Sequence, residues 1–465
     1  MRSASTKNRM MGGIRVSNEG VALIYPYILE EQPVEEEKLF PPLSIAYLSS
    51  QLKERSVPVS VHDGTFHSPQ EVIRNVVQEL PAIVSIYLMI TLVRNGLYLL
   101  DSLRKLLPDT LFITGGPLPS LYPGRFADAF DVVFRGEGDL TVARFCDEYR
   151  NSECTPADLS TLDLSSYPGI YQHRGNTVIS APPIHHPVAV IEALPLPDRS
   201  SFDHTRYQKF WECTAGCRMT TIMITRGCPY SCDFCSKPVW GNNFRKPSLD
   251  RVFAEIQEIL ALGYDRLWIA DDSFTLDIGY LREFCTRKIR ESLSFTWVCL
   301  SRVDRLDESI VRLMRDAGCV RVYLGLESGN DETLRLMGKR ASVGEGIETV
   351  HLFRNAGIET SGFFIVGYPG ETQISIDDTL SLASSLPLDE ISINVPFPLP
   401  GSPLFSRVGS IDTTADWDKA NEITFIYQSE FDEAVLREKI KQATALFRER
   451  RQKRNEAQSW CYIRR

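Results

Sequence analysis

The chain has 465 residues, of which 43% are hydrophobic and 24% charged, as expected for a globular protein of two or three domains. Its formal net charge of −9 argues against a general nucleic-acid binder, because phosphate binding depends mainly on Lys and Arg. No apolar run has the length of a membrane-spanning helix, and no signal peptide is visible. We therefore expect a cytoplasmic protein whose eleven cysteines are reduced thiols or metal ligands rather than disulfides.

The first 150 residues alternate between patterns typical of strands and of helices. Pro42 suits a helix start, and apolar residues recur on one helical face after it. The alternation predicts a parallel sheet with helices on both faces, a Rossmann-like doubly wound α/β domain over 20–150 that follows a tail at 1–19. Ligands of such sheets bind at the carboxyl ends of the strands. The expected strands are 20–28, 57–63, 82–90, 111–116 and 130–139.

Residues 151–215 lack a clear period and are rich in proline, so we interpret them as a linker. This segment contains the adjacent histidines His185 and His186. We expect them in a solvated loop rather than in a metal site, because no other ligand pattern surrounds them.

The second half of the chain repeats the alternation more regularly. Six βα units predict a partial TIM-type barrel over 216–405, with its chemistry at the carboxyl ends of the strands. Residues 406–465 include one long helical pattern with a basic end, either a solvated face or a docking surface for an acidic partner. The barrel strands are expected at 220–227, 266–274, 296–304, 320–328, 360–371 and 390–401, and each ends in glycine or polar residues.

Three cysteines follow the first of these strands, in the stretch "TRGCPYSCDFCSKP" at 225–238. Cys228, Cys232 and Cys235 have the spacing C-x3-C-x2-C. A structural zinc site needs four protein ligands, and no fourth cysteine or histidine lies within finger-like reach. A thioredoxin-type motif would need only two cysteines. Three thiolates on one loop suit a 4Fe–4S cluster held at three corners, whose fourth iron is free to bind another ligand.

The motif and its context resemble the radical S-adenosylmethionine (SAM) superfamily. The cysteines follow the first strand of a six-unit barrel, with Phe234 just before the last of them, and "ADDSF", "SRVD", "GLESGN" and "FFIVGYPGE" resemble later strand-end motifs. The family's fifth-strand pattern, G-x-I-x-G-x-x-E, is matched only loosely, with the spacing off by one at each end, by Gly362, Ile365, Gly367 and Glu371. The resemblance implies that the cysteines ligate the cluster and that SAM chelates its open iron.

The resemblance also implies contacts to SAM, and the residue types suit them. Asp271 and Asp272 are suited to an ammonium, Arg302 to a carboxylate through its planar fork, and Glu327 and Ser328 to ribose hydroxyls. No protein residue is assigned as a catalytic acid or base, because the implied radical abstracts a hydrogen atom itself. The expected SAM-binding residues are Phe234, Asp271, Asp272, Arg302, Glu327, Ser328, Ile365 and Gly367.

The amino-terminal half resembles the cobalamin-binding domain that precedes this barrel in one large subgroup, through "FPPLSIAYLSSQLKERSVPVSVHDG", "ITGGPLPS" and "VVFRGEGD". The cobalt-ligating motif Asp-x-His-x-x-Gly is missing, because Asp63 and His67 have the wrong spacing and lie on the wrong strand. The resemblance thus implies cobalamin bound without a protein imidazole, its lower face shaped by 87–95; a vestigial domain is the alternative. The expected cobalamin-binding residues are Thr91, Gly115, Gly116, Pro117, Gly136, Glu137 and Gly138.

Together the resemblances imply a cobalamin-dependent radical SAM methyltransferase that transfers a methyl group from SAM, through methylcobalamin, to an unactivated carbon. Its cofactors would be a 4Fe–4S cluster, SAM and cobalamin, and its partner an external low-potential electron donor. A cyclase or rearrangement enzyme with the same cofactors is the alternative, because fold and cofactors do not fix the reaction. A cobalamin sensor would not need the cysteine motif, and an RNA methylthiotransferase would carry three more cysteines near the amino end. The substrate, whether a small-molecule intermediate, a lipid or a protein side chain, has no readable signal.

Cys213 and Cys217 lie four residues apart, just upstream of the first barrel strand. They could bind a second cluster or a metal, but we interpret them as ordinary reduced thiols. Cys285, Cys299 and Cys319 fall within helix and strand patterns and are expected to be buried structural residues.

Overall fold

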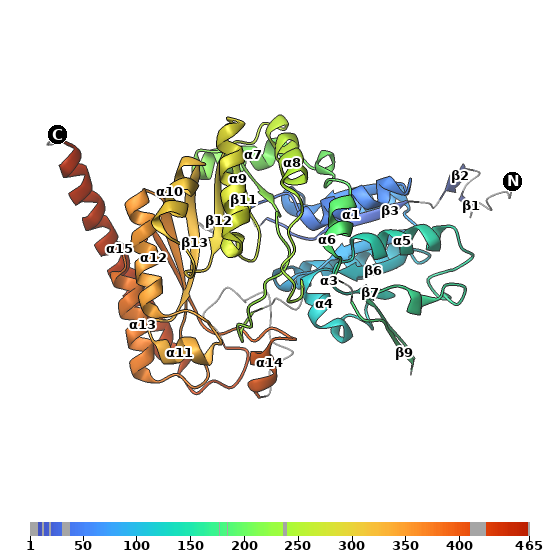
Figure 1. Ribbon diagram of the computed structural model, residues 1–465. Coiled ribbons are helices and arrows are strands. Elements are labelled where there is room, and N and C mark those ends of the chain that lie inside the picture. Colours follow the sequence, from blue (N-terminus) through green and yellow to red (C-terminus); the bar gives the residue numbers. More distant parts are fainter. Residues whose placement is uncertain are drawn as a thin grey trace. The chain divides into compact units, whose positions relative to one another are not determined.

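The structure is a computed structural model that describes residues 8–11, 14–17, 20–29, 38–175, 177–183, 185–235, 240–409 and 425–463. The chain divides into two compact units (Figure 1). The first comprises Met1–Arg218 with Pro238–Gly241, and the second comprises Met219–Lys237 with Asn242–Arg465. Each unit contains its own sheet and its own hydrophobic core.

The sheet of the first unit has the strand order β4-β3-β5-β6-β7-β8-β9. The five strands from β3 to β7 are all parallel. Across the sheet, β4 lies at the edge beside β3, and β5, β6 and β7 follow on the other side of β3. This doubly wound order has its topological switch point between β3 and β5, where such folds bind ligands. All five predicted strands are therefore confirmed. Their bounds are β3 (Val21–Tyr25), β4 (Val59–Asp63), β5 (Ile83–Tyr87), β6 (Leu111–Gly115) and β7 (Val132–Phe134).

Helices connect these strands, and their ends carry the expected start signals. The helix α2 begins with a capping box in which Ser68 and Glu71 satisfy each other's backbone N–H groups, with Pro69 in the first turn. Apolar side chains of α1 and α5 pack with the buried strands into one core. The helices are α1 (Leu43–Glu54), α2 (Pro69–Glu79), α3 (Val93–Leu106), α4 (Pro117–Leu121) and α5 (Asp139–Arg150).

The segment that we expected to be a linker instead adds to the fold of the first unit. It contributes β8 (Ile170–Arg174) and β9 (Thr177–Ser180), which extend the sheet antiparallel to β7. It also forms α6 (Val188–Ala193) and α7 (His204–Ala215). Side chains fix it to α1, because Asp198 accepts hydrogen bonds from Ser49 and Lys53, both at 2.6 Å. The short strands, largely exposed on one or both faces, have too few alternating residues to show a period in the sequence.

The second unit confirms the six predicted βα repeats. Its strands are all parallel and lie in chain order from β10 to β15, as in a partial barrel (Figure 1). The strands are β10 (Met219–Ile222), β11 (Arg266–Ile269), β12 (Thr296–Ser301), β13 (Cys319–Glu327), β14 (Glu359–Ile365) and β15 (Glu390–Asn394). The helices are α8 (Leu249–Ala261), α9 (Ile278–Arg290), α10 (Glu308–Asp316), α11 (Asp331–Leu336), α12 (Val343–Ala356) and α13 (Gln373–Ser385).

The two faces of this second sheet differ in composition. On one face, residues such as Leu267 and Val322 belong to a large core shared with the helices. Strand side chains alternate between faces, so Trp268, Tyr323 and Phe363 point to the opposite, inner face. Their rings form a row, with centroids 4.7 Å apart for Trp268 and Tyr323 and 5.9 Å apart for Tyr323 and Phe363. The inner face therefore carries an aromatic wall with rings from β11, β13 and β14.

The carboxy-terminal part of the chain confirms the predicted long helix. After the short α14 (Pro403–Arg407), α15 (Glu433–Ile463) packs against α13, where Lys439 pairs with Asp377 at 2.6 Å. Near the amino end, β1 (Asn8–Met11) and β2 (Ile14–Ser17) pair antiparallel. Within the described residues, no helix combines the length and the apolar character needed to cross a membrane.

Candidate functional site

The three cysteines lie on a loop that leaves β10 through Gly227, whose φ of 84° suits a residue without a Cβ. The thiols of Cys228, Cys232 and Cys235 are all partly exposed. The loop's backbone is anchored at Asp233, whose N–H donates to the carbonyl of Met337 at 2.9 Å. Its carbonyl accepts from the N–H of Leu404 at 3.0 Å. A fixed, half-exposed loop that presents three thiols is the arrangement that a cluster requires.

The donor set fits an iron–sulfur cluster better than a single metal ion. Within the described part of the chain, no three His, Cys, Asp or Glu side chains converge on a point that one ion could occupy. In a 4Fe–4S cubane each cysteine binds a different iron, so the three thiolates stay further apart than the ligands of one zinc. Burial raises the pKa of Cys228, and the charge of Asp272 adds to this effect. That thiol therefore stays protonated until metal displaces its proton.

Asp271 and Asp272 are neighbours with different environments. Asp271 is 2% exposed and accepts hydrogen bonds from the N–H of Ile224 at 2.7 Å, the N–H of Thr225 at 2.9 Å and the hydroxyl of Thr225 at 2.6 Å. Burial raises the pKa of Asp271 to about 7, although these hydrogen bonds favour its charged form. Asp271 thus fixes the end of β10 just before the cysteine loop, whereas Asp272 is exposed.

Arg302 lies directly beside the cysteine loop. Its guanidinium carbon stacks 3.5 Å from the ring centroid of Tyr230, and its Nε donates to Asp304 at 2.7 Å. Its Nη2 donates to the carbonyl of Arg340 at 3.0 Å, and its Nη1 lies 4.0 Å from the sulfur of Cys232. The fork that we assigned to the SAM carboxylate is therefore already engaged by protein groups in this structure.

Glu327 and Ser328 lie at the carboxyl end of β13, where a bulge interrupts the pairing with β14. Glu327 has a φ of 63°, in the left-handed region that residues other than glycine rarely occupy and that recurs at functional sites. Its carboxylate pairs with the buried Lys339 at 2.8 Å. Ser328 is buried, with its hydroxyl 2.9 Å from that of Thr379. The bulge thus aims Glu327, and Ser328 joins the strand end to α13.

Two of the remaining expected SAM-binding residues share one apolar cluster. Phe234 and Ile365 both pack, partly buried, against the buried Tyr368 and Leu404. Gly367 has a φ of 80°, and an added Cβ there would lie 2.9 Å from side-chain atoms of Leu436 and Phe425. The carboxy-terminal segment therefore completes this cluster. No local pattern in the sequence signals this contribution, because these contacts join distant parts of the chain.

The glycine turns of the first unit lie together at the carboxyl edge of its sheet. Gly116 has a φ of 115°, and a Cβ there would lie 2.5 Å from the carbonyl oxygen of Leu88. The turn runs from Gly115, at the end of β6, to Pro117, the first residue of α4. Ser120 bridges two turns, since its hydroxyl donates to the carbonyl of Gly116 at 2.7 Å and accepts from the N–H of Gly136 at 2.9 Å. No motif in the sequence singles out Ser120.

The other residues expected at this edge are placed as follows. Glu137 is buried, with an oxygen 3.5 Å from Nδ1 of His185, and Gly138 directly precedes α5. Thr91 lies, half-buried, in a 3-10 turn (Ile90–Leu92) after β5. At the switch point itself the rings of Tyr25 and Tyr87 lie 5.9 Å apart, another feature that the sequence analysis missed. The expected solvated loop at His185–His186 is wrong for His186, which is 4% exposed.

Comparison with known protein families decides between the possible identities. The family described as the B12 binding domain matches residues 37–145, and the Radical SAM superfamily matches residues 222–383. The chain carries a B12-binding domain followed by a radical SAM domain. The two families imply a 4Fe–4S cluster, SAM and cobalamin, which confirms the predicted cofactors and the prediction of a radical SAM enzyme, but not of a methyltransferase.

Curated relatives of this radical SAM protein include more than one type of enzyme. An uncharacterized methyltransferase of Pyrococcus horikoshii is 26% identical over 396 residues, which cover 82% of each chain. An anaerobic magnesium-protoporphyrin IX monomethyl ester cyclase of Rubrivivax gelatinosus is 25% identical over 83% of this chain and 69% of its own. The similarity therefore supports a cobalamin-dependent radical SAM enzyme and leaves the reaction open.

Solved structures share the fold of this radical SAM protein. The methyltransferase TsrM of Kitasatospora setae, solved with its tryptophan substrate and a SAM analog, aligns with a TM-score of 0.67 and 18% identity. The alignment covers 83% of this chain and 75% of that one. The cobalamin-dependent enzyme OxsB aligns with a TM-score of 0.65 and 19% identity, over 79% of this chain and 52% of its own. The predicted fold class is therefore confirmed.

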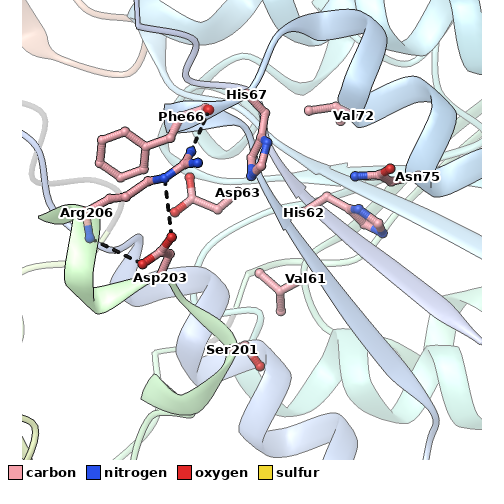
Figure 2. Close-up of a pocket in the computed structure, with 10 residues that line it drawn as sticks. All are labelled: Val61, His62, Asp63, Phe66, His67, Val72, Asn75, Ser201, Asp203 and Arg206. Atoms are coloured by element: carbon pink, nitrogen blue, oxygen red, sulfur yellow. Dashed lines mark hydrogen bonds and ion pairs between the residues drawn. The ribbon is translucent and has the colours of Figure 1, made fainter.

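The first unit has a hollow at the edge strand β4. Figure 2 shows this cavity of about 200 Å³, with Asp63 and His67 on one side and Asp203 and Arg206 on the other. Asp63 accepts hydrogen bonds from Thr65 and from the hydroxyl of Tyr207, the latter at 2.5 Å. Arg206 donates to the carbonyl of Phe66 at 3.0 Å and pairs with Asp203. The hollow therefore marks where α7 is fixed to the sheet.

The remaining cysteines show no second cluster among the residues that the structure places. Cys213 is exposed on α7, whereas Cys217, after the helix, is buried. Cys285, Cys299 and Cys319 are all buried in the core of the radical SAM domain, which confirms their predicted burial. The interpretation of Cys213 and Cys217 as ordinary thiols stays a prediction.

Proposed function

We propose that this radical SAM protein is a cobalamin-dependent methyltransferase that transfers a methyl group from SAM to an unactivated carbon atom of its substrate. The observation that carries the proposal is one chain that joins a three-cysteine loop on a partial barrel to a B12-binding domain with a glycine-lined carboxyl edge. Methyltransferase relatives that cover most of the chain support the same reaction.

In this proposal each group of residues holds one cofactor. Cys228, Cys232 and Cys235 hold the cluster, and the exposed Asp272 binds the ammonium group of SAM. Glu327, aimed by its bulge, bonds the ribose, and the apolar residues around Phe234 and Ile365 pack the adenine. The glycine turns let the backbone approach cobalamin at Gly115, Gly116, Gly136 and Gly138. When bound, these cofactors supply reductive cleavage of SAM and a carrier for its methyl group.

The protein's other contribution is to orient the substrate and exclude water. The inner face of the barrel presents the aromatic wall of Trp268, Tyr323 and Phe363, whose one ionisable group, the phenol of Tyr323, has its pKa raised by burial. Beyond this wall, Arg321 is paired with Glu359 and Glu390, so its charge is already neutralised. Such a wall offers the substrate an apolar surface, and excluding water there would protect a reactive intermediate from side reactions.

The second candidate function is ring closure or rearrangement with the same cofactors. Three relatives named as cyclases, 25% to 28% identical, favour it. Both candidates need the cluster, SAM and cobalamin, so no residue described above distinguishes them. The fate of the methyl group does distinguish them, because only a methyltransferase moves it to cobalt and then to carbon.

The test is an anaerobic reconstitution with iron, sulfide and cobalamin, followed by SAM labelled in its methyl group and a low-potential chemical reductant. Labelled methylcobalamin together with 5′-deoxyadenosine, read by mass spectrometry, is the expected result. If 5′-deoxyadenosine forms while cobalamin takes up no label, the methyltransferase proposal fails and the cyclase takes its place. A Cys232→Ala variant is the control, and it should form no 5′-deoxyadenosine.

A further inference from the structure

The environment of Arg302 distinguishes it from an ordinary substrate-binding arginine. Its side chain is 8% exposed, and it lies over the ring of Tyr230, which belongs to the cysteine loop itself. Asp304 holds both partners, since it accepts from Nε of Arg302 at 2.7 Å and from the hydroxyl of Tyr230 at 2.6 Å. The carbonyl of Arg340 holds a second edge of the guanidinium at 3.0 Å. The protein thus immobilises a buried cation without any ligand.

The position of this cation is set relative to one particular cysteine. Nη1 of Arg302 lies 4.0 Å from the sulfur of Cys232. At that distance the interaction is mainly one of charge, and it is strong because burial reduces screening by water. Reduction of a cluster adds one negative charge to it, and a fixed positive charge nearby stabilises the reduced state more than the oxidised one. Charges and donors around the sulfurs are a known determinant of cluster potential.

We propose that Arg302 is a positioning residue that raises the reduction potential of the cluster held by Cys228, Cys232 and Cys235, with Asp304 and Tyr230 fixing its position. Asp304 also moderates the effect, because its carboxylate partly neutralises the guanidinium at 2.7 Å. The inference requires only that the cysteines bind the cluster. It holds equally for a methyltransferase and for a cyclase.

The rival role for Arg302 is the one expected from the sequence, a fork for the SAM carboxylate. The two roles predict different measurements. A carboxylate fork changes the affinity for SAM and leaves the potential of the SAM-free cluster untouched. A fixed cation beside Cys232 changes that potential before any SAM is added.

The experiment is redox titration of the reconstituted, SAM-free protein, followed by electron paramagnetic resonance of the reduced cluster. Arg302→Gln should shift the midpoint potential to a more negative value, and Arg302→Lys, which keeps the charge, should recover part of the shift. Arg312→Gln is the matched control, because it removes the same charge from an exposed side chain of α10 that pairs with Glu308 and not with Asp304, where water screens it. That variant should titrate like the wild type.

Asp304→Asn supplies an independent test if Arg302→Gln fails to bind the cluster. Removing this carboxylate leaves the guanidinium held by Tyr230 and Arg340, so the potential should shift in the opposite, more positive direction. An unchanged potential in Arg302→Gln, with weaker SAM binding, overturns the inference and restores the carboxylate fork. So does an unchanged or more negative potential in Asp304→Asn. If the wild type itself binds no cluster, the assignment of the three cysteines fails instead.

Discussion

The hydroxyl of Tyr368 donates a hydrogen bond of 2.6 Å to the carboxylate of Asp233, which lies between the second and third cysteines of the loop. Tyr368 is fully buried just after β14, so this bond joins the cysteine loop to the opposite part of the sheet. Arg407 of α14 pairs with the same carboxylate at 2.7 Å. The cysteine loop is therefore held by residues from 135 to 174 positions later in the chain.

We expect Tyr368→Phe to destabilise the protein by about 1–3 kcal/mol, because it leaves a partly buried carboxylate with one partner fewer. The free energy of unfolding in urea measures the loss, and iron content after reconstitution should fall with it. Tyr427→Phe is the matched control. Tyr427 contacts the same apolar cluster, and its hydroxyl has no hydrogen-bond partner among the described residues, so removing it should cost nothing. Equal losses in the two variants would show that the bond to Asp233 does not matter.

Asp271 should make stability depend on pH. Burial raises its pKa from an ordinary value near 4 to about 7, so between these values the folded state binds more protons than the unfolded state. Stability from this group is therefore greatest below pH 4 and is lost as the pH rises to about 7. We expect the unfolding free energy of the wild type to fall relative to that of Asp271→Asn as the pH rises from about 4 to about 7. Above that range the difference between the two proteins should stay constant. A constant difference from pH 4.5 to 8 contradicts the raised pKa.

The sequence predicted the regular part of this molecule well, because strands and helices there are long enough to show their periods. It also located the cysteine loop, whose spacing is local. It did not separate Asp271 from Asp272, although a signal was present. The buried alternation of Leu267 and Ile269 in β11 continues to Asp271, which places Asp271 on the buried side and Asp272 on the other.

Other features could not be found in this way. Ser120 becomes informative only because the fold brings the turns at Gly116 and Gly136 within reach of one hydroxyl. The segment at 151–215 shows no period, because its strands are short and half of their residues face solvent. Contacts such as Asp233 with Arg407 depend on tertiary structure, and no local pattern encodes them.

Gly116→Ala should damage the B12-binding domain more than an ordinary glycine substitution. Its φ of 115° and ψ of −176° lie in a region essentially restricted to glycine, and the new Cβ would lie 2.5 Å from a backbone oxygen. We expect a loss of more than about 2 kcal/mol in unfolding free energy and weaker cobalamin binding, measured by absorbance titration. Gly175→Ala is the control, since it also has a positive φ, 60°, but meets no atom within 4 Å. Similar losses in both variants would mean that the close approach at Gly116 is unimportant.

Asp272 should bind the ammonium group of SAM. Asp271 should affect SAM binding only indirectly, because it fixes the backbone just before the cysteine loop. We expect Asp272→Asn to weaken SAM binding about tenfold, or about 1.4 kcal/mol, since it replaces a charge-assisted hydrogen bond by a neutral one. Calorimetric titration of the reconstituted, unreduced protein measures the affinity directly. Stability should change little, because the side chain is exposed. Asp316→Asn, on the exposed surface of α10, removes the same charge and should leave the affinity unchanged. Wild-type affinity in Asp272→Asn would instead assign the ammonium to another group on the loop.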